Sequence, residues 1–140
     1  ETVPERLDRL IASGAMPPVA VAFPACFTRL GGNQYINSAG TGRWADFLIE
    51  EAVPSVEKEF GCGGRGKRGI FGKSSGGYGA MVHALLYPDF WSGAAVHSGD
   101  MAFDLMYRHE FPTVLRALAA VGGSPQAWLE KFFAAPKTKD

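Results

Sequence analysis

The spacing of hydrophobic residues changes along the first part of the chain, and each spacing predicts a different element. Residues 5–11 repeat apolar side chains at helical intervals, and Gly14 follows as a stop. Residues 19–23, VAVAF, form a continuous apolar run, which predicts a strand buried on both faces. Residues 28–42 are polar and rich in glycine, so they predict a long loop of the kind that is usually functional or mobile.

The middle of the chain predicts two helices with a strand between them. Residues 43–60 carry apolar side chains every three or four positions, which predicts an amphipathic helix, kinked or restarted near Pro54. Residues 61–66 predict a flexible turn because they are rich in glycine. A short strand is expected to end at Phe71, followed by a tight turn and a helix over residues 75–86.

The last part of the chain continues this alternation. Tyr87-Pro88-Asp89 is expected to end the helix, and WSGAAVHSG predicts a strand that ends near His97. Residues 103–133 predict short helices with breaks at Pro112 and Gly122-Gly123. The order helix, strand, helix, strand, helix, strand indicates an α/β fold with a parallel sheet. Because no repeat, low-complexity tract or linker interrupts residues 1–140, they predict a single domain.

The stretch GKSSG has the pattern Gly-x-Ser-x-Gly, between a predicted strand and a predicted helix. At such a turn the serine has a strained backbone, and the residues two before and two after it approach so closely that a Cβ would clash. Gly72 and Gly76 occupy those positions. Gly77 and Gly79 continue the small face, so the first turns of the helix are expected to lie close against neighbouring strands.

This context predicts that Ser74 is a nucleophile at a helix N-terminus, where developing negative charge is favoured. The backbone N–H of Ser75 would then be one oxyanion donor. The alternative is a phosphate-binding loop, because Gly-Lys-Ser is also present. That motif requires a glycine five positions before the Gly-Lys-Ser glycine, whereas Lys67 stands there. We therefore favour the serine interpretation.

The charge balance and the cysteines exclude several other classes of function. With 14 basic and 14 acidic residues the chain is neutral, which gives no electrostatic reason to expect nucleic acid as a partner. No apolar run is long enough for a membrane span, and the first ten residues do not form a signal peptide. Cys26 and Cys62 match no metal spacing, and two separate thiols are favoured over a disulfide.

The segment FGKSSGGYGAMVHALLYPDFWSGAAVHSGD resembles the core of the putative esterase family of α/β-hydrolases. That family includes S-formylglutathione hydrolases, enterochelin esterases and mycolyltransferases. The shared pattern is a Gly-x-Ser-x-Gly-Gly turn, a helix that ends in Tyr-Pro-Asp, and a strand that runs into Ser-Gly. Here these are residues 72–77, 87–89 and 98–99, and the resemblance covers residues 17–100.

The resemblance implies an α/β-hydrolase fold, a three-layer sandwich around a mainly parallel sheet, and a serine carboxylic-ester hydrolase that forms an acyl-enzyme on Ser74. It implies a small-molecule ester as substrate and no cofactor. In this family the acid and the histidine of the triad follow the serine on later strands. We therefore expect residues 1–140 to be the central part of a larger domain, inactive alone, with the acid and the histidine elsewhere. The alternative is a non-catalytic relative that serves as a binding or scaffold protein.

Within the chain, three histidines and two aspartates could serve the site. His83 falls in the middle of the predicted helix and is expected to be structural. His97 ends a strand at the edge where active sites form, so it could line the pocket, although a structural role is favoured. His109 follows Asp100 and Asp104 too closely for an acid and a base from different strands. Asp100 could line the pocket, but a helix N-cap is the favoured role.

Four other residues are weaker candidates. Lys73 precedes the serine and could contact a polar or anionic acyl group. Tyr35, Asn37 and Trp44 could border a substrate cleft, although loop packing explains them equally well. The sequence leaves open which ester is cleaved, whether acyl transfer replaces hydrolysis, and the oligomeric state. The compartment also stays open, with a slight preference for the cytoplasm.

Overall fold

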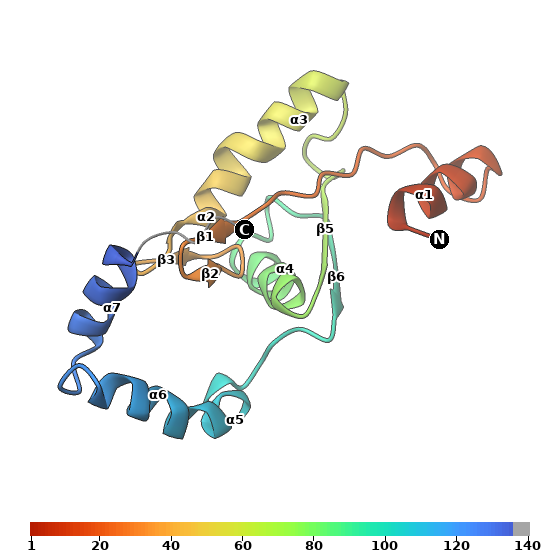
Figure 1. The fold of residues 1–140 in the computed structure, drawn as a ribbon. Helices are drawn as coiled ribbons and strands as arrows, with labels where there is room; N and C mark the ends of the chain where they lie inside the picture. The colour runs from red at the N-terminus through yellow and green to blue at the C-terminus, as the bar shows by residue number, and fades with distance from the viewer. Residues whose placement is uncertain (136–140) are drawn as a thin grey trace. The chain divides into compact units, whose positions relative to one another are not determined.

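A computed structural model describes residues 1–135 of the chain. The chain divides into two compact units, Glu1–Gly99 and Asp100–Asp140. The first unit contains a parallel strand pair with the helix that connects it, and the second contains short helices (Figure 1).

Helix α1, Val3–Ala12, begins at a capping box, as its sequence allows. The Thr2 N–H donates to a Glu5 carboxylate oxygen at 2.7 Å, and the Glu5 N–H donates to the Thr2 hydroxyl at 3.4 Å. Gly14 follows with a φ of +72°, a conformation that glycine adopts without strain. The predicted first helix is therefore confirmed, with a start two residues earlier than predicted.

The prediction of a buried strand over residues 19–23 is wrong. These residues form no strand in the described part of the chain, and Val19 and Phe23 are 48% and 61% exposed. A strand requires a neighbouring backbone for its hydrogen bonds, which an apolar run cannot specify. The Phe23 ring instead meets the Phe71 ring edge to face, with centroids 6.3 Å apart.

The predicted loop over residues 28–42 contains two small antiparallel hairpins. Strands β1, Phe27–Thr28, and β2, Gly31–Gly32, form the first, and strands β3, Asn37–Ser38, and β4, Gly42–Arg43, form the second. Between the hairpins, Gln34 and Tyr35 have φ values of +55° and +62°. The chain therefore makes a strained turn at this point.

The predicted amphipathic helix forms as three successive segments that differ in winding. It runs through α2, Trp44–Asp46, the π-helical segment η1, Phe47–Ala52, and α3, Val53–Phe60. Pro54 stands in the first turn of α3, where its missing N–H is tolerated. The restart predicted near Pro54 is thus confirmed. Gly61 ends α3 in the left-handed conformation, with a φ of +59°.

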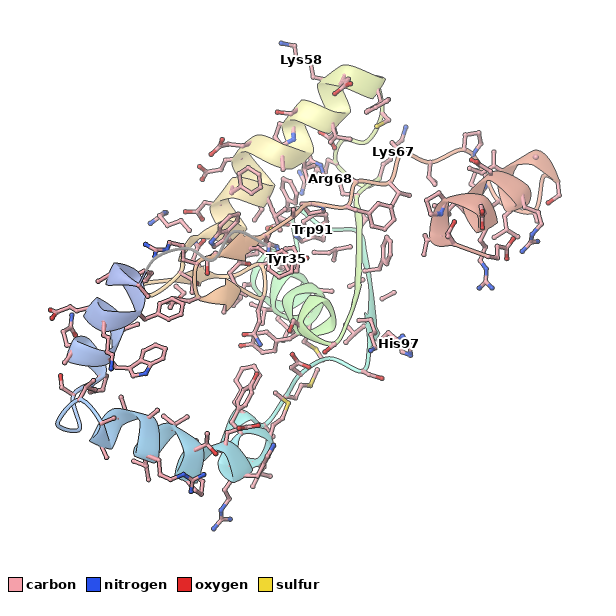
Figure 2. All side chains as sticks on the ribbon, viewed as in Figure 1. Tyr35, Lys58, Lys67, Arg68, Trp91 and His97 are labelled. Atoms are coloured by element: carbon pink, nitrogen blue, oxygen red, sulfur yellow. The ribbon has the colours of Figure 1, made fainter. Side chains whose placement is uncertain are left out.

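The glycine-rich turn after α3 is anchored by Glu57. One carboxylate oxygen of Glu57 accepts the Gly64 N–H and the Arg68 Nε–H, each at 2.7 Å, and the other accepts Arg68 Nη2 at 2.8 Å. Figure 2 labels Arg68 in this region, and its guanidinium lies 4.1 Å from the centre of the Phe90 ring. The Arg68 bonds, followed by the Gly64 N–H, lower the pKa of Glu57 from 4.5 to about 2.

Replacement of Glu57 by glutamine is expected to remove part of the acid sensitivity of folding. A carboxyl whose folded pKa is lowered stabilises the fold above its unfolded pKa, and this stability is lost as the pH falls through its folded pKa. The free energy of unfolding of the wild type should therefore decline between pH 4.5 and about 2 more steeply than that of the variant. Urea titrations across this range measure it, with Glu59→Gln on the same helix as control. Equal slopes for Glu57→Gln and wild type would contradict the assignment.

The centre of the first unit is a strand, a helix and a parallel strand. Strand β5, Gly69–Lys73, leads into α4, Ser75–Leu86, and then into β6, Gly93–His97. The register pairs Gly69 with Gly93 and Lys73 with His97. The helix has the predicted bounds and β6 ends at His97 as predicted, while β5 continues two residues beyond the predicted end. Within the described residues the parallel sheet comprises these two strands, which agrees with the α/β class.

Buried side chains gather around α4 and the helix that begins with α2. Few residues are fully buried, and β6 is exposed along its whole length. Apart from Gly77 and Gly79 in α4, the buried residues of the described chain are Cys26, Asn33, Ala45, Leu48, Ala80 and His83.

The second unit consists of short helices. These are α5, Phe103–Met106, the 3-10 turn η2, Arg108–Glu110, α6, Phe111–Ala119, and α7, Pro125–Ala134. The predicted break between helices at residues 122–123 is confirmed.

One further prediction for the second unit is confirmed and one is wrong. The break expected at Pro112 is confirmed, because α6 begins at Phe111 and Pro112 stands in its first turn, where its lack of an N–H costs nothing. Asp100 was expected to cap the next helix, but the N-cap of α5 is Ala102, in a left-handed conformation with a φ of +50°. A sequence pattern cannot show where the chain turns left-handed, and this turn delays the helix start.

Candidate active site

Ser74 stands between the last residue of β5 and the first residue of α4. Its φ is +57° and its ψ is −122°, a conformation that costs a residue with a side chain about 1–3 kcal/mol. The Ser74 N–H donates to the carbonyl oxygen of His97 at 3.1 Å, so the turn is bonded to the end of the neighbouring strand. Strain of this kind persists only where the surrounding structure holds it.

The close approach predicted at the turn exists, but one glycine accounts for it. A Cβ added at Gly72 would overlap the Cα, carbonyl carbon and carbonyl oxygen of Gly76. A Cβ added at Gly76 would meet nothing within 4 Å. The prediction that both positions exclude a side chain is therefore correct for Gly72 and wrong for Gly76, because the Gly76 Cα turns its open side away from the strand.

Gly77 and Gly79 also lie at close contacts, on different sides of α4. A Cβ at Gly77 would come within 2.8 Å of the Gly99 Cα and 3.0 Å of the His97 carbonyl oxygen. A Cβ at Gly79 would come within 3.3 Å of the Tyr35 Cβ and would crowd the Gln34 carbonyl oxygen. Gly77 therefore lets α4 approach the end of β6, as predicted, whereas Gly79 accommodates the strained turn and not a strand.

Lys73 and His97 end the two parallel strands side by side. They are paired in register, and both are exposed. His97 lies at one end of β6 in Figure 2. The carboxyl ends of parallel strands are where α/β proteins place their sites, so both residues border the turn that carries Ser74. Ser75 begins α4, and the first N–H groups of a helix have no acceptor within the helix.

His83 is fully buried, with 0% exposure, and both of its ring nitrogens are engaged. Trp91 Nε1–H, which can only donate, lies 3.1 Å from His83 Nδ1, and His83 Nε2 lies 2.8 Å from the Tyr35 carbonyl oxygen. Nδ1 therefore accepts and Nε2–H donates, which fixes the neutral tautomer. Burial lowers the pKa of His83, against a smaller opposite effect of the Tyr35 bond. The predicted structural role is confirmed.

His109 pairs with a carboxylate that the sequence analysis did not consider. Its Nε2 lies 3.2 Å from a carboxylate oxygen of Glu110, its neighbour in the chain, and both side chains are exposed. Asp104 stands in α5, and Asp100 is half-buried at the start of the second unit.

The side chains of Asn37 and Trp44 form hydrogen bonds with backbone groups of the loop and of the helix start that follows it. The Asn37 side-chain oxygen accepts the N–H groups of Ala45 and Asp46 at 3.0 and 3.3 Å, and Trp44 Nε1–H donates to the Thr41 carbonyl oxygen at 2.7 Å. These bonds match the loop-packing alternative. Trp44 also lines a shallow, mainly apolar hollow next to the loop.

The sequence did not predict the two hydrogen bonds by which His83 connects Tyr35 and Trp91. Tyr35 and His83 are 48 positions apart, and no local pattern connects them. The one available signal was a histidine inside an otherwise apolar helix, since a buried histidine needs a partner for each nitrogen.

Within residues 1–135, no three histidine, cysteine, aspartate or glutamate side chains group as a metal site requires. Cys26 and Cys62 are free thiols, one buried and one exposed. No helix in this part of the chain has the length and apolar character to span a membrane.

The strand, strained serine turn and helix, followed by a parallel strand, define an α/β protein, and the carboxyl edge of its strands is the candidate site. The family model of the putative esterases matches residues 3–128. The chain therefore belongs to the putative esterase family, as its sequence predicted. No protein with curated annotation matches it significantly.

Family membership supports a hydrolase of the esterase type and small-molecule esters as substrates. It also indicates an α/β-hydrolase-like fold, to which the helices and the small parallel sheet of the described residues conform.

Proposed function

We propose that the protein is a serine carboxylic-ester hydrolase in which Ser74 is the nucleophile. The observation that carries this proposal is the backbone of Ser74, with a φ of +57° between β5 and α4. Such strain in a residue with a reactive hydroxyl, held by the Gly72–Gly76 contact and by the His97 carbonyl, is what a presented nucleophile requires.

In the proposed reaction the Ser74 Oγ attacks the ester carbonyl carbon and loses its proton to a histidine base. The carbonyl oxygen becomes an oxyanion, which accepts a hydrogen bond from the Ser75 N–H at the helix N-terminus. The alcohol then leaves with the proton from the histidine, and an acyl-enzyme remains. Water releases the acid by the same steps. His83 is not this base, because both of its nitrogens are bonded elsewhere.

Lys73 and His97 are proposed to border the acyl pocket, since they end the two strands beside the turn. The Lys73 ammonium would favour polar or anionic acyl groups by charge attraction. Asp100, three positions after the end of β6, is a proposed pocket residue on its order in the chain alone. We also propose that residues 1–140 belong to one α/β-hydrolase domain.

A fluorophosphonate probe tests this function directly, because it phosphonylates only a serine that is activated as a nucleophile. The natural protein that contains this chain, at its natural length, is expected to be labelled stoichiometrically, and peptide mass spectrometry should locate the adduct on Ser74. Protein unfolded in urea is the control and should not react. A folded protein that stays unlabelled would overturn the proposal and favour a non-catalytic binding or scaffold role.

A further inference from the structure

The turn between the two hairpins has a strained backbone, and side chains from outside its two central residues hold it by hydrogen bonds. Gln34 and Tyr35 both have positive φ values, and the Ile36 N–H approaches the Asn33 carbonyl oxygen at 3.4 Å. A turn of this form normally uses glycine or asparagine at both central positions. The buried Asn33 side chain stabilises this turn, because its oxygen accepts a hydrogen bond from the Tyr35 N–H at 2.7 Å.

His83 supports the same turn from the helix that carries Ser74. Its Nε2–H donates to the Tyr35 carbonyl oxygen at 2.8 Å, and Trp91 holds the other ring nitrogen at 3.1 Å. Figure 2 shows Tyr35 and Trp91 beside α4, and His97 apart from them at the end of β6. The Tyr35 backbone carbonyl and the Trp91 side chain, from different segments, thus fix a single orientation of the His83 ring.

The contacts of α4 are spread over two sides of the helix. Gly79 and His83 are one turn apart and meet the Gln34–Tyr35 turn, whereas Gly77 meets the end of β6 and Gly99. Because α4 is in contact on two sides, it cannot rotate about its axis or shift along it without breaking one of these contacts. The position of its first residues therefore depends in part on the hydrogen bond of His83.

We propose that His83 is a positioning residue: its bond to the Tyr35 carbonyl fixes the rotation and the axial position of α4, and thereby the place of Ser74. The consequence for hydrolysis rests on the proposed function. Ser74 lies nine positions before His83, or about 13 Å along a helix. A displacement of the nucleophile by about 1 Å, caused by a remote change, can reduce turnover by about 100-fold.

Two substitutions separate the two bonds of His83. Glutamine places its amide nitrogen near the position of Nε2, so it keeps a donor for Tyr35 and gives up the Trp91 partner. Asparagine ends near the position of Nδ1, so it keeps an acceptor for Trp91 and gives up the Tyr35 bond. Both leave a buried amide in a space shaped for an imidazole, so their costs in stability should be similar.

In the natural full-length protein we expect His83→Asn to lower kcat per folded molecule by roughly 10- to 100-fold, with a smaller change in KM. His83→Gln should retain most of the wild-type kcat. The folded fraction of each variant is measured by circular dichroism in the same buffer. If wild type hydrolyses esters and the two variants lose kcat equally, His83 has only a structural role and the proposed function stands.

Hydrogen exchange of the Ser74 amide tests the inference without any enzymatic reaction, because this amide is bonded to the His97 carbonyl oxygen. Exchange at Ser74 should be several-fold faster in His83→Asn than in His83→Gln. The Cys62 amide, bonded to the Glu57 carbonyl oxygen at 3.2 Å and remote from both partners of His83, is the control and should exchange equally in both variants. Equal exchange at Ser74 overturns the inference, even if the protein proves to be no esterase.

Discussion

Replacement of Ser74 by alanine is expected to lower kcat/KM for a p-nitrophenyl ester by about 1000-fold or more. The variant has no nucleophile, so the acyl-enzyme cannot form, and only binding and oxyanion stabilisation remain. The backbone strain at this position, with a φ of +57°, is also unfavourable for alanine, but the fold already supports it for serine. Initial rates of the natural full-length protein and the variant, at equal folded concentration, measure the effect.

Ser55→Ala is the matched control for this experiment. Ser55 is exposed in the first turn of α3, and alanine is a better helix former than serine. The control should keep wild-type rates and wild-type thermal stability. A Ser74→Ala variant with near wild-type kcat/KM would show that another residue performs the chemistry.

Replacement of Gly72 by alanine is expected to destabilise the fold by about 3 kcal/mol or more. The added methyl group would overlap the backbone of Gly76, which lies in the first turn of α4 and cannot move like a flexible side chain. To make room, β5 and α4 would have to separate at the turn that carries Ser74. Urea unfolding followed by circular dichroism measures the change.

Gly76→Ala provides the matched control, because the same methyl group at that position meets nothing within 4 Å. Gly76 lies in the first turn of α4, where alanine favours the helix by up to about 1 kcal/mol. We expect unchanged or slightly increased stability. If the two variants were equally destabilised, the close approach would not be confined to Gly72.

Local sequence patterns correctly predicted the helices and strands whose conformation is determined by neighbouring residues in the chain. Residues 75–86 form a helix as predicted, because the preceding turn and the following Tyr87 define both of its ends. Residues 93–97 form the predicted strand. The sequence also predicted membership in the putative esterase family, because a Gly-x-Ser-x-Gly turn between a strand and a helix is a local pattern.

The tertiary structure decided what depends on distant partners. The apolar run at residues 19–23 forms no strand, since its hydrogen bonds would need a neighbouring backbone. Gly72 and Gly76 are equivalent in the motif, but only the path of the helix past the strand shows which Cβ would clash. The sequence marked His83 as structural, yet its partners Tyr35 and Trp91 come from segments that meet only when the chain folds. A local pattern fixes backbone conformation, whereas contacts between distant residues follow from packing, which no short stretch of sequence contains.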